Sequence, residues 1–193
     1  VMILEEADEA YYLFCYKTRD DALIATYHLS TNTREVRFMD ANDPASDLRI
    51  LQPRIEGLDY SAFHHKGNFF IVHNEDAKNF KLSSVSVNDP GKENWVDVLP
   101  HRDDVLVEYV DTFENYLVVH ERTGGLKQIR ISDTDGVSNV RYVQFPEAAY
   151  SVYAEGNSQF ETNLLRLKYS SLITPYTTVD VHMDTGEWEV KKV

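Results

Sequence analysis

The sequence predicts an all-β protein built from β-propeller blades, about four of them, each a four-stranded antiparallel sheet. Two observations lead to this prediction. Short runs rich in Val, Ile, Tyr, Phe and Thr alternate with Asn, Asp, Gly and Pro along the 193 residues, which is the pattern of strands and turns. These runs recur about every 47 residues, and a period of roughly 20 to 50 residues is typical of repeat architectures.

Four series of expected strands share this period. One series is formed by strands that begin 46, 47 and 48 residues apart, at Leu23, Phe69, Tyr116 and Leu164. Four such series describe a four-stranded unit repeated four times, which is the pattern of propeller blades. A β-sandwich with evenly spaced hairpins is the alternative, but it has no need for four matched series.

The period divides the chain into approximate blades at residues 6–54, 55–100, 101–145 and 146–193. Residues 1–5 remain outside these units. Leu4 precedes Leu51 by 47 residues, so we expect residues 1–5 to be the outermost strand of a preceding blade. The leading strand indicates a larger ring, of which this chain supplies a part.

Charge and composition exclude several classes of function. The chain has 19 basic and 32 acidic residues and a net charge of −13, which opposes binding to nucleic acid. Its apolar runs are much shorter than the roughly 18 residues needed to cross a bilayer, and its start has no signal-peptide pattern. A single cysteine excludes an internal disulfide and suits a reducing compartment, so we expect a cytoplasmic protein.

Motifs for catalysis or metal binding are weak throughout. The string closest to a Gly-x-Ser-x-Gly elbow, residues 156–160, lacks the second glycine. His64 and His65 are adjacent on an expected strand and point to opposite faces, and residues 133–136 are expected to form a tight turn and no calcium loop. Cys15 lies in an apolar strand and is expected to be buried. We therefore predict no catalytic, cofactor-binding or metal-binding residue.

Acidic residues gather at residues 5–9, at 103–104, and at Asp111 with Glu114. We expect most of these groups to be solvated loops. The alternative is that carboxylates at one mouth of the propeller attract a cationic peptide.

The most specific string in the chain runs from residue 166 to residue 175. Its defining residues are Arg166, Tyr169, Ser170, Ser171, Thr174 and Pro175. This string and residues 180–187 after it resemble the last propeller blade of oligopeptidase B, also called protease II, in the prolyl oligopeptidase family of serine peptidases. Supporting similarities at residues 30–37, 64–65, 73–82 and 121–126 extend the resemblance over essentially the whole chain.

The resemblance implies a seven-bladed propeller that caps an α/β-hydrolase domain carrying the catalytic serine, aspartate and histidine. In such enzymes the propeller admits peptides and excludes folded proteins, and oligopeptidase B cleaves after Lys or Arg. The expected partners are therefore the C-terminal hydrolase domain and basic oligopeptides, and the six motif residues are expected to be structural.

Two other functions remain open at this level. One is a free-standing propeller that scaffolds protein partners, and the other is a sugar-acting propeller enzyme with paired carboxylates. The open ring edges at residues 1–5 and at the fourth blade are also expected to favour self-association, because unpaired strands are templates for pairing.

Overall fold

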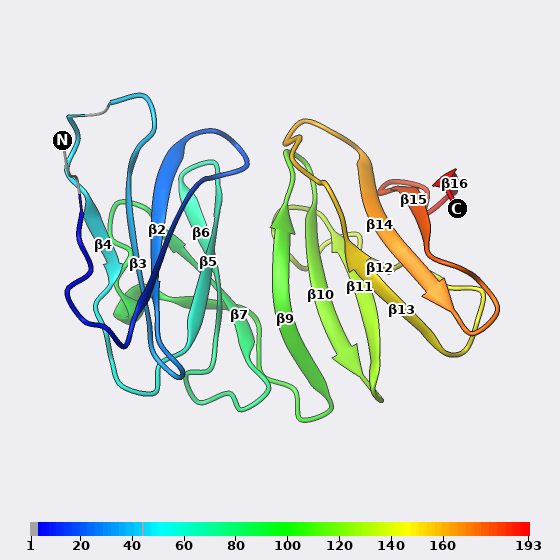
Figure 1. The fold of residues 1–193 in the computed structure, drawn as a ribbon, viewed down its shortest axis with the longest axis horizontal. Helices are drawn as coiled ribbons and strands as arrows, with labels where there is room; N and C mark the ends of the chain where they lie inside the picture. Colours follow the sequence, from blue (N-terminus) through cyan, green and yellow to red (C-terminus); the bar gives the residue numbers. More distant parts are fainter. Residues whose placement is uncertain (1–3, 44) are drawn as a thin grey trace. The chain divides into compact units, whose positions relative to one another are not determined.

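The computed structural model describes residues 4–43 and 45–193. These residues contain sixteen strands in four separate four-stranded sheets, with one short 3-10 helix at Lys92–Asn94 (Figure 1). Within each sheet the strands are antiparallel and follow one another in chain order. The predicted all-β architecture of four-stranded blades is confirmed.

The chain divides into two compact units, residues 1–101 and 102–193, and each unit holds two sheets. The first sheet contains β1 (Tyr12–Lys17), β2 (Leu23–Leu29), β3 (Arg34–Asp40) and β4 (Arg49–Gln52). The second contains β5 (Tyr60–His65), β6 (Asn68–His73), β7 (Lys81–Ser86) and β8 (Val96–Leu99). The third contains β9 (Val105–Thr112), β10 (Leu117–Thr123), β11 (Leu126–Ser132) and β12 (Arg141–Tyr142). The fourth contains β13 (Tyr150–Ala154), β14 (Leu164–Ser171), β15 (Thr177–His182) and β16 (Trp188–Lys192).

The core of the first unit lies between its two sheets. Alternate residues of a strand point to opposite faces, so one face of the first sheet can pack on one face of the second. Phe38 of β3 and Phe69 of β6 meet edge to face, with ring centroids 5.0 Å apart. The buried Tyr60 hydroxyl accepts a hydrogen bond from the Val36 N–H at 2.8 Å and donates one to the Gln52 carbonyl at 2.9 Å. This tyrosine therefore joins the second sheet to β3 and to the end of β4.

The core of the second unit is formed in the same way by the third and fourth sheets. It is made of fully buried aliphatic side chains from both sheets, among them Val118, Ile129, Ile131, Val152, Leu165, Leu167, Val179 and Val181. Four aromatic rings extend this core, those of Phe145, Tyr150, Tyr169 and Trp188. The Tyr169 ring centroid lies 5.5 Å from the centroids of both Phe145 and Trp188. Burial of these side chains is the main force that holds the two sheets together.

The repeat is also visible in backbone irregularities. Where the third strand of a sheet meets the outermost strand, the register shifts at Val36, at Leu82 and between Thr178 and Val179. Each of these shifts lies at the second or third residue of its third strand, and a β-bulge there increases the local twist. Three of the four sheets thus share one local distortion at one position of the repeat.

The prediction that Cys15 is buried is wrong, because its side chain is exposed. The strand that carries it, β1, is an edge strand paired only with β2, and residues 12–15 are exposed on both of its faces. An apolar sequence indicated a buried strand, but burial depends on what covers the strand, and none of the residues that the structure describes buries residues 12–15.

We expect the exposed Cys15 to react with a maleimide or an aromatic disulfide in the native chain. The rate should be close to that of the same chain unfolded in denaturant, because neither state shields the thiol. Thiol labelling followed by mass spectrometry measures both rates. Strong protection in the native chain would contradict the exposed position.

Residues 1–3 of the expected leading strand lie outside the described residues, and Leu4 and Glu5 are not in a strand. No helix in the described part of the chain has the length and apolar character required to span a membrane.

Candidate functional site

The string singled out by the sequence forms β14 and the turn that leads into β15. Arg166, Tyr169, Ser170 and Ser171 lie on β14, and Thr174 and Pro175 lie in the turn. Adjacent strand residues point to opposite faces: Tyr169 is buried, while its neighbour Ser170 is only partly buried.

The turn is closed by hydrogen bonds within the string. The Ser171 N–H donates to the Thr174 carbonyl at 2.9 Å. In return the Ser171 hydroxyl accepts the N–H groups of Ile173 and Thr174 at 3.2 and 2.9 Å. The Pro175 carbonyl accepts a hydrogen bond from the Thr177 hydroxyl at 2.9 Å. Small hydroxyl residues are thus placed where the turn needs acceptors and donors.

A carboxylate outside the string holds its two ends together. Glu147 precedes β13, and it accepts a hydrogen bond from the Tyr169 hydroxyl and a second one, at 2.6 Å, from the Thr174 hydroxyl. Glu147 belongs to no motif or cluster that the sequence shows. It lies 22 residues from Tyr169 and 27 from Thr174, and no local spacing rule connects positions so far apart.

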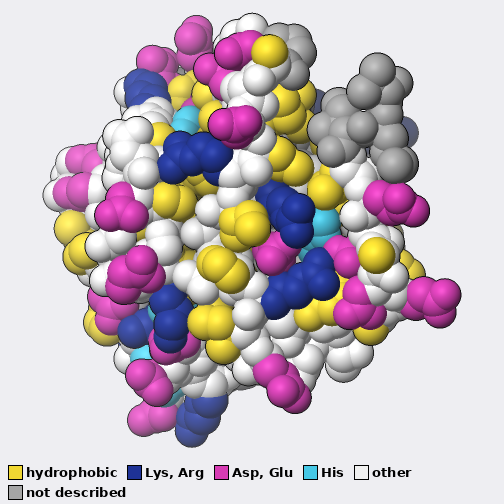
Figure 2. All heavy atoms as spheres, turned by 90° about the vertical axis from the view of Figure 1, so that its left-hand side faces the viewer, with side chains coloured by type: hydrophobic (Ala, Val, Ile, Leu, Met, Phe, Trp, Pro, Cys, Tyr) yellow, Lys and Arg dark blue, Asp and Glu magenta, His cyan; other side chains and the backbone are white. Residues whose placement is uncertain are grey.

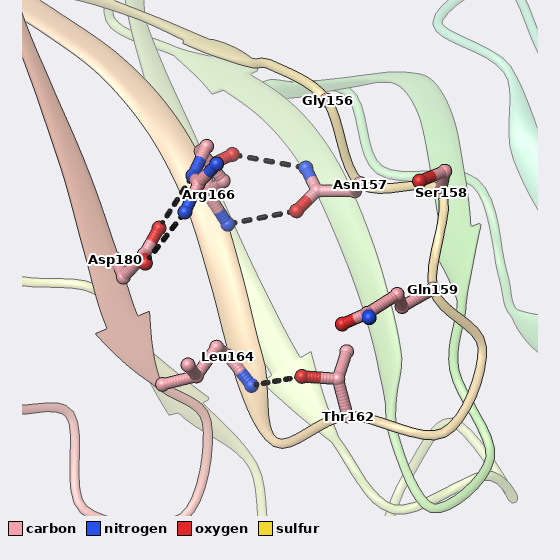
Figure 3. A pocket seen from close by; sticks show the side chains of 8 residues that line it. All are labelled: Gly156, Asn157, Ser158, Gln159, Thr162, Leu164, Arg166 and Asp180. Atoms are coloured by element: carbon pink, nitrogen blue, oxygen red, sulfur yellow. Dashed lines mark hydrogen bonds and ion pairs between the residues drawn. The ribbon is translucent and has the colours of Figure 1, made fainter.

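Arg166 forms an ion pair on the exposed side of the same hairpin (Figure 3). Its Nε and Nη2 atoms donate to the two carboxylate oxygens of Asp180 on β15, at 2.8 and 2.9 Å. Hydrogen bonds from Arg166 hold the pKa of the buried Asp180 below its ordinary value, and Lys191 acts in the same direction from 3.7 Å. Bidentate pairs of this kind fix the geometry of both side chains.

A pocket of about 360 Å³ lies between this ion pair and the loop after β13. It is lined by Gly156, Asn157, Ser158, Gln159, Thr162, Leu164, Arg166 and Asp180. Asn157 takes the place of a strand partner: its side chain accepts the Arg166 N–H at 2.7 Å and donates to the Arg166 carbonyl at 2.9 Å, as Figure 3 shows.

The chemistry of this pocket is limited to polar binding. It offers amide, hydroxyl and guanidinium groups, but its lining includes no histidine that could act as a base toward Ser158. The string at 156–160 contacts β14 through the two hydrogen bonds between the Asn157 side chain and the Arg166 backbone.

Four histidines are buried beside polar partners. The pairs are His28 with Glu6 at 2.5 Å, His64 with Asp20 at 2.6 Å, His73 with Ser83 at 2.8 Å and His120 with Asp111 at 2.8 Å. His64 is buried and its neighbour His65 is only partly so, as expected for adjacent strand residues. Within residues 4–43 and 45–193, no group of three or more His, Cys, Asp or Glu side chains could hold a metal ion.

The expectation that the acidic groups are solvated is wrong for Glu6 and Asp111. Glu6 contacts His28 and Arg54, which are 22 and 48 residues away, and Asp111 is buried against His120 on the neighbouring strand. Burial alone would raise the pKa of Glu6, but hydrogen bonds from His28, the Asp8 N–H and Arg54 lower it to about 2. Figure 2 shows acidic and basic side chains interspersed on the side of the molecule that faces left in Figure 1.

Comparison with known proteins relates this chain to peptidases. The family described as "Prolyl oligopeptidase, N-terminal beta-propeller domain" matches residues 1–193. The chain is 35% identical over 187 residues to dipeptidyl aminopeptidase BI of Pseudoxanthomonas mexicana, covering 96% of this chain and 25% of that protein. It is 29% identical over 192 residues to protease 2 of Moraxella lacunata, covering 100% of this chain and 27% of that protein.

A similar solved structure is that of oligopeptidase B from Leishmania major, with 30% identity and a TM-score of 0.89 over 98% of this chain and 28% of that one. The chain therefore spans about a quarter of the length of these relatives.

Proposed function

Because the chain belongs to the N-terminal β-propeller domain family of the prolyl oligopeptidases, we propose that it is the non-catalytic substrate filter of a serine oligopeptidase that cleaves after Lys or Arg. The observation that carries this proposal is the match of the whole chain to that domain, together with the similarity to protease 2 and oligopeptidase B. The propeller contributes selection by size, and a separate hydrolase domain contributes the chemistry.

The sheets are suited to a passive filter. Each is held by antiparallel strand pairs and by a core of buried side chains, so its dimensions are set by packing. Blades packed at this density would not move apart to admit a folded protein. A flexible peptide that enters a channel loses only its own conformational entropy.

The charge of the chain supports a preference for basic peptides. A net charge of −13 creates a field that raises the local concentration of cationic ligands. In the proposed enzyme, acyl transfer runs through a serine activated by histidine and aspartate, and those residues lie on the hydrolase domain.

The test compares the longer protein that carries this chain with residues 1–193 alone. We expect the longer protein to hydrolyse fluorogenic peptides after Arg and Lys, to leave a matched Pro peptide intact, and to cleave an unfolded polypeptide much more slowly than a short peptide. Residues 1–193 alone should release no fluorophore.

Each part of the proposal has its own contradicting result. Peptide hydrolysis that co-purifies with residues 1–193 through further purification steps would show that the chain itself is catalytic. Cleavage after Pro without cleavage after Lys or Arg would overturn the specificity. A reading frame without a hydrolase domain would favour a scaffold.

A further inference from the structure

The turn between β14 and β15 presents apolar side chains to solvent. Leu172 is 96% exposed, Ile173 is 84% exposed and Tyr176 is 62% exposed. Single exposed apolar residues are common, but a cluster of this kind on one short turn marks an interaction site.

The turn is rigid although its side chains are exposed. The hydrogen bonds that Ser171 makes with Ile173 and Thr174 close it, and Glu147 ties Thr174 to the buried Tyr169. The backbone that carries Leu172 and Ile173 is therefore held in one conformation before any partner binds. A preordered anchor loses little conformational entropy on binding, which raises its affinity.

The fold itself does not require an apolar turn at this place. The corresponding turns after β2, β6 and β10, at residues 30–33, 74–80 and 124–125, contain no exposed large hydrophobic residue. All three close their hairpins with mainly polar residues or glycine. The apolar residues of the β14–β15 turn thus contribute something other than the hairpin.

The turn also lies beside the last residues of the chain. Lys192 of β16 pairs with Thr178 near the start of β15, and Tyr176 and Val193 line one shallow pocket. The family that matches is described as an N-terminal domain, and the chain spans about a quarter of its relatives' length, so the proposed function places a hydrolase domain in the rest of the longer protein.

We propose that residues 172–176, named here the anchor turn, dock this blade onto the hydrolase domain of the longer protein. The inference rests on the proposed function for the existence of that domain. Leu172 and Ile173 would fill an apolar pocket of the domain. The exposed Lys192 lies beside the anchor turn and would face a carboxylate at the rim of that pocket.

Hydroxyl-radical footprinting tests the docking directly, by measuring side-chain oxidation rates in residues 1–193 and in the longer protein. We expect oxidation of Leu172 and Ile173 to fall by roughly a factor of five in the longer protein, because an anchor in a well-packed pocket loses most of its solvent contact. Val137, which is 57% exposed on another turn of the same unit, is the control and should be oxidised equally in both proteins.

Two footprinting results would overturn the proposal. One is equal oxidation of the anchor turn in both proteins. The other is protection in residues 1–193 alone that grows with concentration, because that result would identify a second copy of the chain as the occupant.

Substitution separates docking from folding. The double variant Leu172→Asp/Ile173→Asp should leave the Tm of residues 1–193 unchanged, because both side chains are solvated there. In the longer protein it should abolish the protection of Tyr176 and separate the unfolding of the two domains into distinct transitions. Val137→Asp should do neither, and a double variant that behaves like Val137→Asp would contradict the proposal.

Failure of this inference is distinguishable from failure of the proposed function. Peptide cleavage after Lys or Arg with an unprotected anchor turn removes the docking role alone. A protected anchor turn in a protein that does not cleave after Lys or Arg keeps the docking role and removes the proposed specificity.

Discussion

Replacing Arg102 by Met is expected to lower the free energy of unfolding by roughly 3 kcal/mol, because it leaves the buried carboxylate of Glu121 without its charged partner. Glu121 lies on β10 with a side chain only 1% exposed, and the Arg102 guanidinium donates to its Oε1 atom. The Tyr142 hydroxyl donates to the other oxygen at 3.4 Å, which is a long and weak hydrogen bond. Arg102 is therefore the main compensation for this buried charge.

The adjacent residue on β10 supplies a matched control. Arg122 pairs with Glu108 at 2.9 Å, and the two arginines are similarly exposed, but the Glu108 side chain is 18% exposed against 1% for Glu121. Arg122→Met should therefore cost less than about 1 kcal/mol. Urea denaturation of the two single variants measures both values.

A double variant identifies the cause of the Arg102 effect. Glu121→Gln removes the buried charge, so Arg102→Met/Glu121→Gln should be more stable than Arg102→Met alone. Equal losses for Arg102→Met and Arg122→Met, or no recovery in the double variant, would contradict the buried-charge explanation.

The chain should also lose about 3 kcal/mol of stability between pH 6.5 and pH 4 through His73 alone. Burial, with a smaller contribution from nearby Lys81, lowers the pKa of His73 from 6.5 to about 4. The unfolded chain binds a proton at this residue below pH 6.5, whereas the folded chain does so only below about pH 4. Stability is therefore complete above pH 6.5 and falls as the pH drops through this window.

The hydrogen bonds around His73 explain why its neutral form is favoured. The Ser83 hydroxyl donates to Asp97 at 2.9 Å, so it accepts from His73 Nε2 at 2.8 Å. The Glu75 N–H donates to His73 Nδ1 at 3.3 Å. Both ring nitrogens are satisfied in the neutral tautomer, and a proton added at Nδ1 would face another donor.

The measurement is the free energy of unfolding at several pH values for the natural chain and for His73→Gln. The variant should show a flatter dependence between pH 6.5 and 4, whatever its stability at pH 7. His182→Gln, at a half-buried histidine that ends β15, is the control and should retain the full loss. An identical slope in the natural chain and His73→Gln would refute the assignment to His73.

The fold could be predicted because its signals are local. Alternating apolar and polar residues and β-branched side chains indicate a strand, and Gly, Asn, Asp and Pro indicate a turn. Repetition at about 47 residues then joined these local signals into four blades, which the four sheets confirm. The string from Arg166 to Pro175 was recognised through its resemblance to a known family, and the hydrogen bonds that close its turn lie within a few residues.

The missed features depend on residues distant in sequence. Glu147 reaches Tyr169 and Thr174 across 22 and 27 residues, and Glu6 reaches Arg54 across 48. A run of acidic residues has the same composition whether its carboxylates are solvated or buried against arginine. Only the packed sheets select which carboxylate meets which cation.

Sequence alone determined the all-β class, the blade period and the family resemblance. Strand alternation and turn chemistry involve residues that are close together in the sequence, so they can be read without the fold. Tertiary structure decided that Cys15 is exposed, that Glu6 and Asp111 are paired with buried histidines, and that the β14–β15 turn is rigid with an apolar tip. The physical reason is that burial and ion pairing are properties of what lies across the sheet, and the strand's own sequence does not specify its neighbour.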